Sequence, residues 1–312
     1  PSFDGAVCAV CAIRDHAALQ QMARTELFGA VARRIHDGLF LSHAGSEQFS
    51  YWPGEPVELG GVAVNQGQHP AEVEVRVRVC PKGAKGAEGP VFEARATVTI
   101  EPGQTAKKAF RWTPGQFDAP SYRVTTELLR GGRTIDVIAH ELGVLCDKKP
   151  APDDYITVHD GDFWLRGKRW YPVGVNYWPR YAIALECEDY VYHWLTPGFY
   201  NPEEVERDLA QMESMGLNFV AIRANVKNDR RTLLDFLRRC RNHDIYVFLF
   251  VQTHVITDEP HYFQGIMMPQ HFQEEASADF IRACRLPDNP ALMAYDLIWG
   301  PAGWLFGDQV RM

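Results

Sequence analysis

The stretch NPEEVERDLAQMESMGLNFVAIRANV, Asn201 to Val226, decides the expected fold because it joins a helix directly to a buried strand. Asn201 is a good N-cap, Pro202 suits the first helical position, and Gly216 can end the helix. The run that follows, LNFVAIRANV, is almost continuously apolar, as strands of a parallel sheet are. A helix followed at once by such a strand is one unit of an alternating α/β fold.

The same alternation extends to both sides of this stretch. The strand-like YPVGVNYW precedes it, and DRRTLLDFLRRCRNHD, IYVFLFVQTHV, a helix around PQHFQEEASADFIRACR, and ALMAYDLIW follow. This order predicts a parallel sheet covered by helices. Ahead of the sheet, tight turns at Asp160–Asp162 and Arg166–Lys168 predict a small hairpin. Residues 150–312 are therefore expected to form one α/β domain.

Residues 49–149 have the pattern of antiparallel β-structure. In AEVEVRVRVC, valines alternate with charged residues, which predicts a half-buried strand, and Gly131–Gly132 predicts a hairpin turn. About seven short strands with regular turns indicate an immunoglobulin-like sandwich. We expect this domain to serve packing. The alternative is a carbohydrate-binding module, whose aromatic candidates Trp52 and Trp112 also suit a core or an interface.

Residues 1–48 read as a separate segment. The apolar run AVCAVCAI predicts a strand, and the helix after it is capped by Asp15 and ended by Gly38. One strand and one helix cannot form a core, so we expect this segment to dock on another domain. Cys8 and Cys11 are expected to be buried free thiols. A redox or zinc site is not expected, because no second pair of cysteines accompanies them.

The composition excludes several classes of protein. A chain of 312 residues with 46% hydrophobic and 23% charged residues is ordinary for a soluble globular protein. The net charge of -8 argues against a nucleic-acid partner, and no apolar run is long enough to cross a membrane. No signal peptide is visible, so the compartment stays unknown. An odd count of 7 cysteines argues against a disulfide scaffold. No glycine-rich phosphate loop or close His/Asp cluster occurs, so no cofactor or metal is expected.

Several motifs between residues 155 and 303 resemble the (β/α)8 barrel of clan A glycoside hydrolases, especially the cellulase and β-mannanase family 5. Phe163–Lys168 with Gly174–Asn176 resembles the family's entry hairpin and first strand. DLAQMESMGLNFVAIRA, IYVFLFVQTH and NPALMAYDLIWGP resemble its next three steps. The resemblance implies a TIM-type barrel of which this chain holds the first half, about four βα units. Because an incomplete barrel leaves an open edge, we expect a longer polypeptide, or a second chain or self-association that completes it.

The resemblance also implies a site at the C-terminal ends of the strands. Arg223 matches the family's arginine that supports the catalytic carboxylate, His254 matches its histidine, and Gly300 stands where the family has its acid/base glutamate. Five further residues are expected to bind substrate, the tryptophans among them by stacking on sugar rings. They are Asn176, Tyr177, Trp178, Trp299 and Trp304.

The expected function depends on the acid/base carboxyl group, which is missing at position 300. Retaining glycosidases need two carboxyl groups about 5–5.5 Å apart, and a glycine has no proton to give. We therefore expect retaining hydrolysis of a β-linked oligo- or polysaccharide in an intact parent, with this chain inactive. Gly300 is an engineered change, a natural one, or a misaligned position. Asp296 is a weak substitute, better suited to a structural hydrogen bond. The alternative is a non-catalytic carbohydrate-binding or assembly protein.

Overall fold

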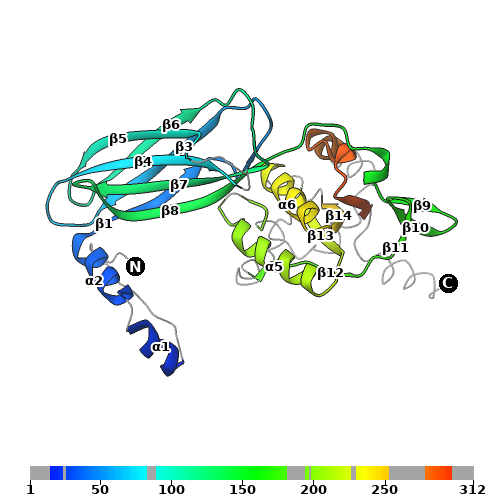
Figure 1. Ribbon diagram of the computed structural model, residues 1–312, viewed down its shortest axis with the longest axis horizontal. Coiled ribbons are helices and arrows are strands. Elements are labelled where there is room, and N and C mark those ends of the chain that lie inside the picture. Colours follow the sequence, from blue (N-terminus) through cyan, green and yellow to red (C-terminus); the bar gives the residue numbers. More distant parts are fainter. Residues whose placement is uncertain are drawn as a thin grey trace, which may run out of the picture. The chain divides into compact units, whose positions relative to one another are not determined.

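The computed structural model describes residues 15–23, 26–82, 89–180, 194–196, 198–225, 230–252 and 278–296. The chain forms two compact units, Pro1–Val144 and Leu145–Met312 (Figure 1). The first unit contains helices α1 (His16–Ala23) and α2 (Leu27–Asp37) and strands β1 (Leu39–Ser46), β2 (Ser50–Tyr51), β3 (Val57–Asn65), β4 (Ala71–Pro81), β5 (Phe92–Ile100), β6 (Thr105–Trp112), β7 (Ser121–Arg130) and β8 (Arg133–Val144).

The first unit is a two-layer β-sandwich. One sheet has the strand order β1-β3-β6 and the other β2-β8-β7-β4-β5. The valines of β4 point inward and are at most 1% exposed, as the alternation predicts. Trp112 is 8% exposed and packs edge-on against Phe117 and Tyr122, so it belongs to the core. It is therefore not a surface platform for a sugar.

Two turns decide how the strands of the sandwich connect. Gly131 and Gly132, with φ of 56° and 77°, close the predicted β7–β8 hairpin, whose two strands pair from Arg130 and Arg133 onward. The turn at residues 101–104 instead joins strands of different sheets, because β5 pairs with β4 and β6 with β3. The sandwich is thus established, and its immunoglobulin-like topology stays a prediction.

The expected boundary at residue 49 differs from the structure. Asp15 caps α1 through the backbone N–H of Ala17, and Gly38 ends α2 with φ of 63°, both as predicted. The expected single helix is present as two. Strand β1 pairs antiparallel with β3 and contributes Leu39 and Leu41 to the core, so the sandwich begins at Leu39. The local pattern could not show this, because the pairing partner lies farther along the chain.

The second unit contains a parallel sheet in the strand order β12-β13-β14-β15, which is also the order along the chain. This confirms the expected parallel sheet, and the half-barrel itself stays a proposal. Residues 278–283 are helical as well. The other elements are the turns η1 (Pro152–Asp154) and η3 (Leu286–Asp288), strands β9 (Thr157–His159), β10 (Asp162–Leu165), β11 (Lys168–Trp170), β12 (Gly174–Asn176), β13 (Phe219–Asn225), β14 (Tyr246–Gln252) and β15 (Leu292–Asp296), and helices α5 (Pro202–Ser214) and α6 (Arg230–Asn242).

The small hairpin β9-β10-β11 lies at the N-terminal edge of this sheet. The ring of Trp170 is 5.5 Å from that of Tyr246, the first residue of β14. Arg166, in the β10–β11 turn, pairs at 3.3 Å with Asp244, just before β14. Sites in parallel α/β sheets lie at the opposite, C-terminal edge of the strands. In the described part of the chain, no helix is long and apolar enough to span a membrane.

Candidate functional site

One face of the parallel sheet gathers polar side chains at its C-terminal edge. Arg223 of β13 is in register with Phe250 of β14, which is in register with Asp296 of β15. Neighbours in register on parallel strands point to the same face, so these three side chains form one row. Asn176 of β12 pairs with Ala221 and lies two positions earlier on that same face. Four strands thus bring together residues that are far apart in the sequence.

The guanidinium group of Arg223 supplies the positive charge of this row, and the carboxylate of Asp296 supplies the negative one. Arg223 is 5% exposed, and its guanidinium carbon lies 5.3 Å from the ring centroid of Phe250. A cation over an aromatic face is attracted to the ring, and the contact is stronger when it is desolvated. Asn176 is exposed at the same face, and Trp178, two residues on, is half-buried. This face therefore carries a cation, a carboxylate, an amide and an indole, which suits a polar ring with hydroxyl groups.

Tyr177 was predicted to contact substrate, and the structure places it on the other side of the sheet. It is 3% exposed, stacks on Phe236 of α6 at 5.7 Å, and donates its hydroxyl to Asp208 of α5 at 2.9 Å. The physical reason is the alternation of side chains along an extended segment, which sends Asn176 and Tyr177 to opposite faces. Tyr177 is therefore part of the helix-covered core.

Trp194 is another core residue. Its ring is fully buried and meets Tyr177 and Phe236 edge-on, at 6.0 and 5.2 Å between ring centroids. Its indole N–H donates to the main-chain carbonyl of Arg223 at 3.1 Å. Trp194 thus contacts the candidate site from behind, through the backbone.

The remaining predicted residues lie outside the described part of the chain, and the structure does not test them. They are His254, Trp299, Gly300 and Trp304. Asp296 is the only carboxylate in the described strands of the parallel sheet. Within the described residues, no group of three or more His, Cys, Asp or Glu side chains is placed to hold a metal ion.

A buried polar network between α5 and α6 is the feature that the sequence interpretation missed. Asp235 is fully buried and accepts from Tyr200 at 2.9 Å, from Arg238 at 2.9 Å and from Arg239 at 2.8 Å. Arg239 reaches across to Glu206 of α5 at 2.7 Å. Burial lowers the pKa of the Arg239 guanidinium, but the charges of Asp235 and Tyr200 and the hydrogen bonds to Asp235 and Glu206 together outweigh burial, and the net direction is upward. The i,i+4 spacing of Asp235 and Arg239 was the available signal.

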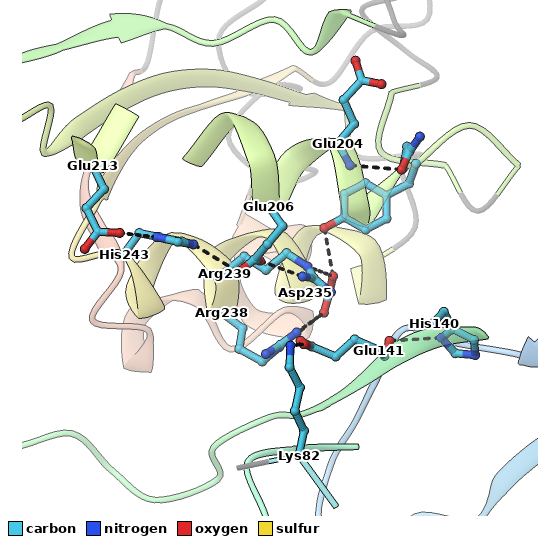
Figure 2. Close-up of polar contacts among 12 residues, drawn as sticks. Lys82, His140, Glu141, Glu204, Glu206, Glu213, Asp235, Arg238, Arg239 and His243 are labelled. Carbon is cyan, nitrogen blue, oxygen red and sulfur yellow. Dashed lines mark hydrogen bonds and ion pairs between the residues drawn. The ribbon is translucent and has the colours of Figure 1, made fainter. Parts of the chain in front are cut away.

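The network continues to the surface through His243, as Figure 2 shows. Its Nδ1 lies 2.6 Å from Glu213 and its Nε2 lies 3.1 Å from Glu206. Ionised carboxylates only accept, so the protonated imidazole, in which both ring nitrogens donate, satisfies both contacts. Burial lowers the pKa of His243, but the hydrogen bonds to Glu213 and Glu206 outweigh burial and raise it. This network joins two helices on the side of the sheet away from Arg223, which indicates a structural role.

Comparison with known proteins gives only a weak likeness. No protein-family model matches the chain, and no curated protein matches it. Among similar solved structures are a glycosyl hydrolase family 2 member from Bacteroides cellulosilyticus (13% identity, TM-score 0.34, 88% of this chain and 34% of that chain) and a Bacteroides uniformis β-glucuronidase (18%, 0.36, 89% and 29%). A third is a β-galacturonidase from Eisenbergiella tayi (15%, 0.33, 83% and 41%).

The chain therefore spans about a third of the length of these structures. Their descriptions name glycoside hydrolases, in agreement with the coarser resemblance, but of family 2 and not of family 5. At TM-scores below 0.5 this likeness carries no argument about function. The case for a site depends on the residues of the C-terminal edge.

Proposed function

We propose that this chain is part of a clan A glycoside-hydrolase-like protein and that the C-terminal edge of its parallel sheet faces a β-linked glycan. The observation that carries the proposal is Arg223, buried at that edge over Phe250, with Asn176 exposed on the same face. A sugar offers hydroxyl groups to the guanidinium and amide groups, and an apolar ring face to Trp178. The finer assignment to family 5 is part of this proposal.

The reaction of the intact parent would be retaining hydrolysis, for which position 300 holds the acid/base group. Gly300 cannot donate a proton, so the chain as it stands is proposed to be inactive. A non-catalytic carbohydrate-binding protein is the second candidate. It is favoured by the single carboxylate, Asp296, on the described strands of the sheet, because retaining hydrolysis requires two.

Saccharide binding tests what the two candidates share. We expect the full chain to bind cellohexaose or mannohexaose in isothermal titration calorimetry, and Trp178→Ala to weaken binding about threefold to tenfold through loss of stacking. The matched control is Trp164→Ala, in the hairpin at the opposite edge. If neither saccharide binds, or if both variants weaken binding equally, the proposed site is wrong.

Activity separates the two candidates. We expect Gly300→Glu, introduced into the longest natural form of the protein, to release a chromophore from an aryl β-glycoside. The parent protein with Gly300 and a Gly300→Gln variant serve as controls, because neither residue is an acid at neutral pH. If Gly300→Glu binds saccharide and stays inactive on every aryl β-glycoside tried, the hydrolase proposal is refuted and the binding protein remains.

A further inference from the structure

The ladder between β12 and β13 is incomplete at the point where the candidate site begins. Asn176 pairs with Ala221, and the N–H of Tyr177 donates to the Ala221 carbonyl at 2.9 Å. In a parallel pair, every second carbonyl of one strand faces the same neighbour, so the next acceptor on this side is Arg223. The residue that would donate to it is the second one after Tyr177. That residue is Pro179, which has no N–H.

The missing donor is replaced by a side chain. The indole Nε1 of Trp194 lies 3.1 Å from the Arg223 carbonyl oxygen, within a buried environment. A buried carbonyl without a partner would cost free energy, so this bond satisfies a requirement that the strand itself creates. The bond acts on the backbone of the residue whose side chain carries the charge of the site.

The side chain of Trp194 is itself fixed by buried contacts on its ring and at the next residue. Its ring meets Tyr177 and Phe236, both buried. The next residue, Leu195, is also fully buried, and its carbonyl accepts from the hydroxyl of Thr232 on α6. The indole N–H is therefore fixed relative to α6 and to the segment that follows β12.

We infer that Trp194 is a positioning residue for Arg223, with an indole N–H that takes the place of the backbone donor absent at Pro179. By closing the ladder at the end of β13, it sets the direction in which the Arg223 side chain leaves the strand. Packing alone would require only the ring. Positioning requires the N–H, and this difference can be tested. The inference rests on the proposed function only in treating Arg223 as part of a saccharide site.

The test removes the N–H and keeps the shape of the ring. Trp194 is replaced by 3-benzothienylalanine, in which sulfur stands for the N–H group, and separately by Phe. The control is Trp164→Phe, because the buried indole N–H of Trp164 has no hydrogen-bond partner among the described residues. The readouts are the carbonyl carbon resonance of Arg223, detected through the amide of Ala224, the Arg223 Nε–H resonance, and cellohexaose and mannohexaose affinity.

We expect both Trp194 variants to shift the two Arg223 resonances and to weaken saccharide binding about twofold to tenfold, the usual range for one hydrogen bond. The Trp164→Phe protein should change neither. If the benzothienyl variant leaves the Arg223 Nε–H resonance in place, Trp194 acts by packing alone and the inference is wrong. If the unmodified chain binds no saccharide, the proposed function fails, and the resonances of Arg223 still decide whether Trp194 positions it.

Discussion

Replacement of Asp235 by alanine should be among the most destabilising single changes in the second unit. Asp235 is fully buried and is the shared acceptor of Tyr200, Arg238 and Arg239. The side chain of Arg239 is 3% exposed, so after the change a guanidinium stays buried with one partner fewer. Removal of one partner from a buried ion pair costs about 3–5 kcal/mol, because the remaining charge is left uncompensated.

The same chain offers a matched control with the same chemistry and different burial. Asp279 and Arg282 form an i,i+3 pair at 2.8 Å, as Asp235 and Arg238 do at 2.9 Å, but their side chains are 80% and 72% exposed. Exposed helical pairs contribute about 0.3–0.5 kcal/mol. Asp279→Ala should therefore change the free energy of unfolding by less than about 0.5 kcal/mol, and the difference between the two variants reports burial.

The assay must read the second unit by itself, because a chain with two units need not unfold in one step. Hydrogen exchange measured by mass spectrometry on peptides of β13, α6 and β14, across a urea series, does so. With a slope of about 2 kcal/mol per molar urea, the Asp235→Ala midpoint should fall by about 1.5–2.5 M. Asp235→Asn keeps the volume and one acceptor, so its urea midpoint should lie between those of Asp235→Ala and Asp279→Ala. If Asp235→Ala costs no more than Asp279→Ala, the network does not hold the helices together.

Three further results are expected. Because the pKa of His243 is raised, its contribution to stability is complete below about pH 6.5 and is lost as pH rises through the folded-state pKa. If the difference in the free energy of unfolding between wild type and His243→Gln instead grew with pH, this reasoning would be contradicted. Burial raises the pKa of Glu127, but Arg76 and Arg78 outweigh burial and lower it. The stability advantage of wild type over Glu127→Gln should therefore shrink as pH falls below about 4.3 in acid unfolding, and an advantage that stayed constant with pH would be inconsistent with this. Phe236→Ala, at a fully buried site, should cost about 3–5 kcal/mol in the urea assay, and a cost below about 1 kcal/mol would refute the packing.

Much of the secondary structure was predictable because its causes are local. The Asn201 cap accepts from the Glu204 backbone N–H at 3.1 Å, and the pattern of β4 matches its burial along the strand. Gly161 and Gly167, in the two tight turns, have the positive φ values that glycine permits. Each of these features depends on residues within a few positions, so the sequence pattern contains the information needed.

The candidate site was predictable only in part. Strand ends were identified, and Arg223 and Asn176 do share one face of the sheet. Tyr177 was assigned to the same site, although its neighbour in sequence points the opposite way. The buried role of Asp235 was missed, because a charged residue on a helix is normally solvated. The network around it also needs Tyr200, which precedes α5, and Glu206 of α5, and the local pattern of α6 does not show them.

The sequence alone determined several caps and turns, the order of the strands β12 to β15 along the chain, and the parallel character of their sheet. Those properties follow from residue spacing and from the conformations that glycine, proline and asparagine permit. Only the tertiary structure decided that β1 belongs to the sandwich, that Arg223 lies over Phe250, and that Trp194 donates to the Arg223 carbonyl. These depend on pairing register and on contacts between distant segments, which no local pattern encodes.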